Sequence, residues 1–108
     1  MTLYIELKLY ANEAVVLRNY LIGRLQNVAA VKGMAADGDF ILSEWLNSYF
    51  GAKSVGIERK SKPQSVKMPV SVARILWRSM QHEALMPELQ LILNSIDYYL
   101  TKNDLKPL

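Results

Sequence analysis

The only histidine, His82, is the natural starting point for a search for catalytic chemistry, because general acid–base catalysis and zinc binding both use imidazole. A catalytic triad needs a spaced nucleophile and acid, and a zinc site needs further ligands, but Glu83 and Glu88 nearby supply neither pattern. The chain has no cysteine, which excludes disulfides, thiolate ligands and cysteine nucleophiles. We therefore expect His82 to face solvent at a helix end and predict no metal site.

Two aspartates flank a glycine at Asp37 and Asp39, a spacing also found in calcium loops. A calcium loop needs further oxygen ligands and a glutamate at its twelfth position, whereas residues 40–42 are apolar. Asp39 is better explained as the N-cap of a helix. The glycines at Gly51 and Gly56 fit neither phosphate-loop nor dinucleotide spacing. The sequence thus predicts a non-enzymatic protein without a cofactor.

The basic residues are concentrated in one part of the chain. In total, 13 Lys and Arg stand against 10 Asp and Glu, a net charge of +3. Residues 1–51 carry −1 and residues 68–108 carry 0, so the segment 52–67, at +4, holds the whole excess. Clustered cations bind nucleic-acid phosphates with strong salt dependence and no sequence readout. DNA or RNA is one candidate partner, and the alternative is a solvated connector.

The candidate phosphate-binding residues extend past this segment, because Arg74 and Arg78 follow it one helical turn apart. We expect these cations to form a continuous patch made of Lys53, Arg59, Lys60, Lys62, Lys67, Arg74 and Arg78. Residues 59–64 and 66–69 locally resemble the DNA-embracing arm of bacterial histone-like proteins. The resemblance implies that Pro63 is a wedge for the minor groove of DNA.

The N-terminal segment fits two patterns. Leu3, Ile5, Leu7 and Leu9 alternate with other residues, which is a strand period, but a heptad-like stripe continues from Leu3 to Val31. The segment has no proline between residues 3 and 31 and many good helix formers, while an isolated strand would lack a backbone partner. We therefore expect one long helix over about 3–32, ended by Gly33, with a strand over 3–9 as the alternative.

The remaining helices follow from apolar periodicity and end signals. A turn at residues 36–39 precedes a helix with an apolar face, which ends where Gly51 is the C′ residue. Two further helices are expected, one opening at Ser71 as its cap and one from Pro87 at N1 to Asn103. Residues 52–69 form either a basic connector or a hairpin, in which strands around 55–57 and 66–70 flank a turn at 61–64.

The chain is expected to be one domain, 1–108, with a loose tail at 104–108. The predicted fold is mainly α, a compact bundle of about four helices with a basic central loop or short β-hairpin. The alternative is an α+β fold with a small sheet from residues 3–9 and 54–70. No apolar run approaches the roughly 18 residues of a membrane span, and the first residues lack signal-peptide order. We therefore expect a cytoplasmic protein without membrane association.

The apolar stripe of the first helix is broader than one neighbouring helix covers, so either several helices or a second chain pack on it. We take this helix as the expected self-association surface. The residues assigned to this surface are Leu3, Leu7, Tyr10, Ala14, Leu17 and Leu21. Tyrosine and tryptophan supply further anchors for binding. The sequence favours a protein-interaction module that forms a homo-oligomer and binds an unidentified protein, with a small nucleic-acid-binding protein as the alternative.

Overall fold

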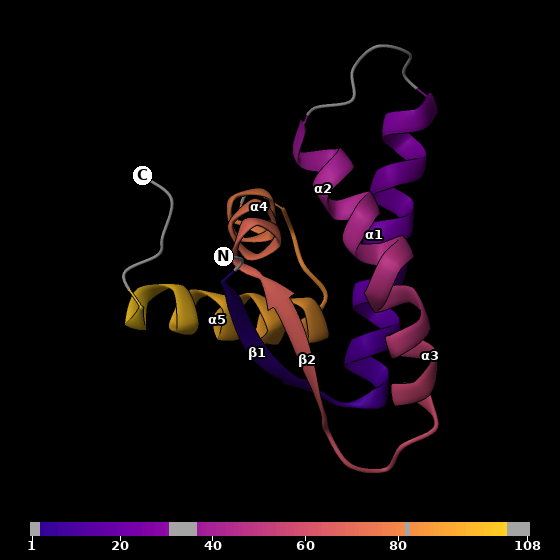
Figure 1. Ribbon diagram of the computed structural model, residues 1–108, viewed down its shortest axis with the longest axis vertical. Helices are drawn as coiled ribbons and strands as arrows, with labels where there is room; N and C mark the ends of the chain where they lie inside the picture. The colour runs from indigo at the N-terminus through magenta and orange to yellow at the C-terminus, as the bar shows by residue number, and fades with distance from the viewer. Residues whose placement is uncertain (1–2, 31–36, 82, 104–108) are drawn as a thin grey trace.

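The computed structural model describes residues 3–30, 37–81 and 83–103, and the fold is mainly helical with a small antiparallel sheet, as expected (Figure 1). Gly33, His82 and residues 104–108, for which expectations were stated, lie outside the described residues. In chain order the elements are β1 (Tyr4–Leu9), α1 (Ala11–Ala30), α2 (Asp37–Trp45), the π-helical turn η1 (Leu46–Phe50), α3 (Gly51–Glu58), β2 (Gln64–Pro69), α4 (Val70–Met80) and α5 (Pro87–Lys102).

The prediction of one long first helix is wrong at its beginning, where the structure confirms the alternative, a strand. β1 pairs antiparallel with β2, from Tyr4 opposite Pro69 to Leu9 opposite Gln64. Every second residue of β1 is buried, so the period of two dominates over the helical stripe. The helix begins only at Ala11, where the backbone N–H of Tyr10 donates to the Glu13 carboxylate at 2.9 Å.

The second helix is longer than expected, because Gly51 does not end it. Trp45, Phe50 and Gly51 all have right-handed helical backbone angles, so α2, η1 and α3 form one continuous rod from Asp37 to Glu58. Counted in this way, the described residues form four helical rods. The N-cap assigned to Asp39 is also wrong, since α2 begins at Asp37.

Of the alternatives for residues 52–69, a hairpin within this segment does not form, and the small sheet instead pairs residues 4–9 with residues 64–69, as in the α+β alternative. Residues 51–58 are helical with Ser54 and Ile57 buried, a spacing of three that fits a helix, and only residues 64–69 form a strand. Helix α4 follows β2 directly, and its N-cap is Pro69 without a side-chain cap, so Ser71 does not have the expected role. Pro87 at N1 of α5 and Asn103 at its C-terminal end are confirmed.

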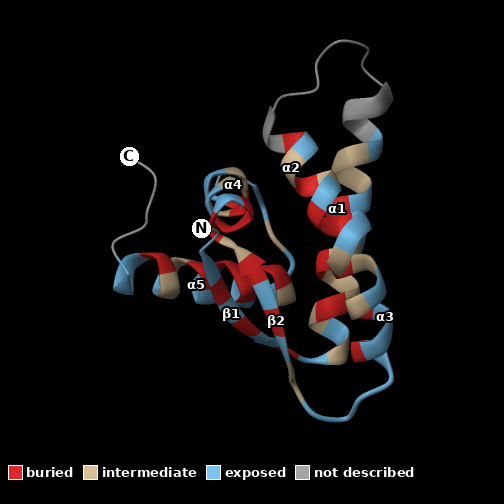
Figure 2. Cartoon of the chain, viewed as in Figure 1, coloured by how far each residue is buried: buried red, intermediate tan, exposed pale blue. Residues whose placement is uncertain are grey.

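One hydrophobic core joins the sheet to all the helices. The buried residues of the strands and rods face inward, while the outer surface of the sheet is exposed (Figure 2). In Figure 1, α5 crosses behind the sheet, and α1 lies beside the rod formed by α2, η1 and α3. Within the part of the chain that is described, no helix is both long enough and apolar enough to cross a membrane.

Candidate functional site

A groove of about 560 Å³ lies between the α2–η1 part of the rod and the β2–α4 junction. Its size falls in the range of roughly 300–1,000 Å³ that is typical of ligand sites. Three of its lining residues are aromatic, and one acid and one base stand among them. The groove is lined by Tyr4, Ile41, Glu44, Trp45, Ser48, Tyr49, Lys67, Pro69, Ser71 and Val72.

The aromatic wall of the groove is fixed to the outer edge of β2. The Trp45 indole N–H donates to the Lys67 carbonyl at 3.3 Å, and the Lys67 N–H donates to the Tyr49 hydroxyl at 3.2 Å. Trp45 also stacks on Phe50, with ring centroids 4.7 Å apart and planes 6° from parallel. The two side chains therefore satisfy backbone groups that a third strand would otherwise pair. These contacts hold the wall in one arrangement.

The rim of the groove carries polar groups from both sides. Glu44 and Ser48 are exposed on the helical side, and Lys67 and Ser71 are exposed on the strand and α4 side. Tyr4 is 56% exposed at one end, on the outer surface of the sheet. The aromatic wall, together with hydroxyl groups and one charge of each sign at the rim, suits a ligand that has apolar side chains and a polar backbone.

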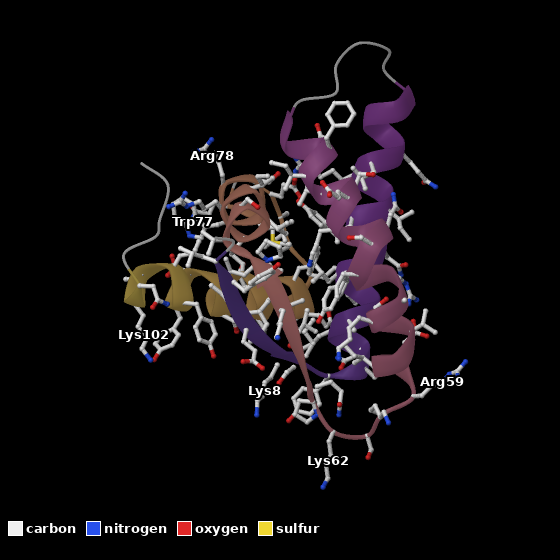
Figure 3. The ribbon with its side chains drawn as sticks, in the orientation of Figure 1. Lys8, Arg59, Lys62, Trp77, Arg78 and Lys102 are labelled. Carbon is white, nitrogen blue, oxygen red and sulfur yellow. The ribbon has the colours of Figure 1, made fainter. Side chains whose placement is uncertain are left out.

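The cations do not form the continuous patch expected from the sequence. Arg59, Lys60 and Lys62 are exposed around the turn between α3 and β2. Arg74 and Arg78 are exposed on α4, and Figure 3 places Arg78 toward the opposite end of the molecule from Lys62. The separation arises because β2 runs back along β1 before α4 begins, which carries the arginines away from the turn.

The other residues of the basic hypothesis have different surroundings. Lys53 is half-buried on α3 and lines a recess of about 220 Å³ together with Lys60. Lys67 lies opposite Glu6 on the outer surface of the sheet. Pro63 is half-buried just before β2, whose residues pair with β1. The two-stranded arm implied by the histone-like resemblance is therefore not formed, because β2 pairs with β1, and the wedge role of Pro63 stays a prediction.

The expected self-association surface is also corrected. Its members Leu7, Ala14, Leu17 and Leu21 are no more than 1% exposed and belong to the chain's own core, so a second chain cannot reach them in this fold. The other two members, Leu3 and Tyr10, remain exposed at the ends of β1. The stripe was broad because it packs against the sheet and several helices of the same chain.

A second polar cluster joins α1 to α2 and α4. Arg24 interrupts the apolar stripe of α1 because it pairs with the buried Asp39 at 3.2 Å and also donates to the Ser79 hydroxyl. The Tyr20 hydroxyl donates to Glu83 at 3.1 Å, and burial, with a smaller effect of the Glu83 charge, raises the pKa of Tyr20. These bonds hold three helices together. Among the described residues, no group of three acidic or histidine side chains is placed to hold a metal ion.

The groove residues are the part of the site that sequence reasoning missed. Trp45 and Tyr49 are four residues apart on one helix face, a pattern that indicates core packing. Their contact with Lys67 joins segments about twenty residues apart, and the sequence carries no signal for it. No family model matches the chain, and no curated protein or solved structure matches it.

Proposed function

We propose that the chain is a non-enzymatic protein-interaction module that binds an extended peptide in the groove beside the sheet. The observation that supports this proposal most directly is the 560 Å³ groove, in which Trp45 and Tyr49 are held by Lys67. Aromatic-lined grooves take extended, proline-containing segments, because a compact apolar ring packs between flat side chains. The expected peptide therefore carries a proline or another compact apolar residue.

Two properties of the groove favour such a partner. Tyr4, which is exposed, and Tyr49, which is half-buried, offer aromatic surface to a ligand, while the buried Trp45 supports the wall. Tyrosine buries a large area with few rotatable bonds, and fixed positions reduce the entropy lost on binding. Glu44 on the helical side and Lys67 on the strand side present opposite charges across the groove. A peptide with a basic residue on one side of its apolar residue and an acidic residue on the other complements both charges.

The test is selection from a randomised peptide library, followed by titration of the enriched peptides against the purified protein. Ser48→Arg places a long side chain in the groove, and we expect it to weaken binding at least about tenfold, or 1.4 kcal/mol. Asn47→Arg is the matched control, because Asn47 is exposed on the same helix but does not line the groove. Equal affinity for the Ser48→Arg variant and the control would contradict the proposal.

A second pair of variants tests the aromatic contribution. Tyr4 at 56% and Tyr98 at 58% are almost equally exposed, but only Tyr4 lines the groove. Tyr4→Ala is expected to weaken peptide binding, whereas Tyr98→Ala, on α5, is expected to leave it unchanged. A loss of similar size in both variants would show that the peptide binds elsewhere.

A second candidate function is the binding of nucleic acid, through its phosphates, at the α3–β2 turn. It is favoured by Arg59, Lys60 and Lys62, which are all exposed there, whereas Arg18 and Arg24 form ion pairs within the chain. Replacing the three cations of the turn by glutamate should abolish a salt-sensitive mobility shift with DNA or RNA and leave the circular dichroism spectrum unchanged. If the unmodified protein gives no shift at low salt, this function is excluded.

A further inference from the structure

The outer edge of β1 is one of the two edges of the sheet, and no strand covers it in the described part of the chain. The sheet has two strands, and the Val70 N–H donates to the Leu3 carbonyl at 2.9 Å. Hydrogen-bonded pairs alternate along an antiparallel ladder, so Leu3 and the odd-numbered residues of β1 bond toward β2. The N–H and C=O groups of Tyr4, Glu6 and Lys8 therefore point toward the outer edge.

The two edges of this sheet differ in how their backbone groups are satisfied. On β2, Lys67 bonds to Trp45 and Tyr49, and Pro69 has no N–H to satisfy. On β1, the described residues show no backbone hydrogen bond for Glu6 or Lys8 apart from strand pairing, and both side chains are exposed. Figure 1 shows α5 crossing behind β1, and Figure 3 shows Lys8 directed away from the protein. The β1 edge is therefore available to another strand.

The sequence of β1 and the following residue is complementary to itself when reversed about Leu7. Tyr4 corresponds to Tyr10, Ile5 to Leu9, and Glu6 to Lys8. When two copies lie antiparallel with Leu7 opposite Leu7 of the partner subunit, Glu6 lies opposite Lys8 of the partner subunit. The symmetry of the pair repeats this contact with the roles exchanged.

The neighbouring registers lack this complementarity. Shifting the strands so that the symmetry axis passes through Glu6 sets two like charges opposite each other. With the axis at Lys8, two lysines oppose each other, and with the axis at Ile5, Glu6 faces Tyr4 of the partner subunit. Opposite charges directly across an antiparallel pair stabilise it, and like charges destabilise it. The charge pattern therefore selects one register.

We propose that two copies of this chain associate through the outer edges of β1, centred on Leu7, to form a continuous four-stranded sheet in the order β2–β1–β1–β2. Each Glu6–Lys8 pair between subunits exchanges two backbone hydrogen bonds, because the outward groups of these residues face each other. The pairing ends near Tyr10, whose N–H is held by Glu13. This interface uses the opposite edge of the sheet from the groove and shares with it only Tyr4, which lines one end of the groove.

A second copy fits this edge better than an unrelated strand does. A charged edge discourages pairing with strands whose charges do not match. If the charges only protected a monomer from pairing with other strands, any charged residues on the edge would do. The symmetric placement of Glu6 and Lys8 about Leu7, with Tyr4 and Tyr10 on either side, would not be needed. A second copy supplies the matching charges in the order that the edge requires, together with two tyrosine pairs on the exposed surface.

The test is a charge exchange measured by sedimentation equilibrium over a dilution series of the full chain. Glu6→Lys sets two lysines opposite each other across the interface, and Lys8→Glu sets two acids opposite each other, so each variant should raise the dimer dissociation constant at least about tenfold. The double variant Glu6→Lys/Lys8→Glu should return it to within about threefold of the unmodified value. In an equimolar mixture of the two single variants, a heterodimer should form, because both pairs between positions 6 and 8 across the interface then have opposite charges.

The design separates dimerisation from folding. Glu6 lies opposite Lys67 within the chain, and the double variant has the same lysine opposite Lys67 as the single variant, so its recovery cannot come from the fold. The double variant Asn19→Lys/Asn47→Lys is the control for overall charge, because both residues are exposed and neither lines the groove or lies on β1. An unmodified protein that stays monomeric at millimolar concentration would overturn the proposal, and so would a dimer that persists in both single variants. Peptide binding is measured in a separate titration with the Ser48→Arg variant, so the outcome of one experiment does not decide the other.

Discussion

Gly51 lies in the continuous rod that positions the groove, and replacing it by alanine tests how closely the backbone of the rod is packed there. The Gly51 N–H bonds to the Leu46 carbonyl, which closes the π-helical turn, and both Phe50 and Gly51 keep right-handed helical angles. A Cβ added at Gly51 would lie 2.9 Å from that same carbonyl oxygen. Because the oxygen belongs to the backbone, Gly51→Ala forces the turn itself to move.

The magnitude follows from two opposing effects. Replacing glycine by alanine in a helix ordinarily stabilises it by about 1 kcal/mol, whereas overpacking at a fixed site costs about 1–3 kcal/mol. We expect Gly51→Ala to lower the free energy of unfolding by about 1 kcal/mol, taking the middle of that range. Gly56 is in the same helix, and a Cβ there meets nothing within 4 Å. Gly56→Ala should therefore raise the free energy of unfolding by about 1 kcal/mol.

Urea denaturation of the two variants and the unmodified protein measures this difference of about 2 kcal/mol. In a domain of this size, each kcal/mol corresponds to about 4–8 °C in Tm. Movement of the turn should also disturb the bonds from Trp45 and Tyr49 to Lys67, so Gly51→Ala should alter tryptophan fluorescence and Gly56→Ala should not. If Gly51→Ala is as stable as Gly56→Ala, the close approach to Leu46 does not constrain the turn and the reasoning is refuted.

Two further predictions concern the polar cluster between α1, α2 and α4. Arg24→Met should lower the free energy of unfolding by about 1–2 kcal/mol in urea denaturation, because Asp39 loses its arginine while only 7% exposed and Arg24 itself is partly screened by water. The loss should be smaller in an Asp39→Asn background, and an equal loss in both would contradict the pairing. Burial raises the pKa of Tyr20 above its ordinary value of 10.0, so its contribution to stability is present below pH 10.0 and is lost as the pH rises through the raised pKa. Tyr20→Phe should make the free energy of unfolding fall less steeply with alkaline pH, and an unchanged slope would show that Tyr20 does not titrate differently in the folded state.

The parts of the fold that could be predicted from the sequence are those set by local signals. Pro87 and Asn103 delimit α5 because a proline at N1 and a polar residue after the last turn act on the backbone nearby. The strand at Tyr4–Leu9 was only an alternative, because its stability depends on β2, about sixty residues away. Local propensity favoured a helix for the same residues, and the distant partner reversed that preference.

The errors around residues 52–69 have a related cause. Val55 and Ile57 alternate like a strand, but they lie in a rod that continues through Gly51, where a π-turn needs no left-handed residue. Once α3 is helical, the only strand available to β2 within the described residues is β1, which places Lys67 beside Trp45 and Tyr49. The groove therefore results from a tertiary arrangement of residues whose individual patterns indicate a core helix and a basic connector.

The two proposed surfaces have a common physical origin in a sheet of only two strands. Such a sheet has two outer edges whose backbone groups need partners, and two strands alone are marginally stable. On the β2 side, aromatic side chains of the rod supply partners for the backbone groups of Lys67 and, in doing so, form a rigid groove. On the β1 side, the described part of the chain supplies no such cover, and the edge has a charge order that another copy of the same strand can match. A peptide ligand and a second subunit would then bind at opposite edges of the sheet, and Tyr4, which lines the groove and lies within the proposed interface, is the residue that the two sites share.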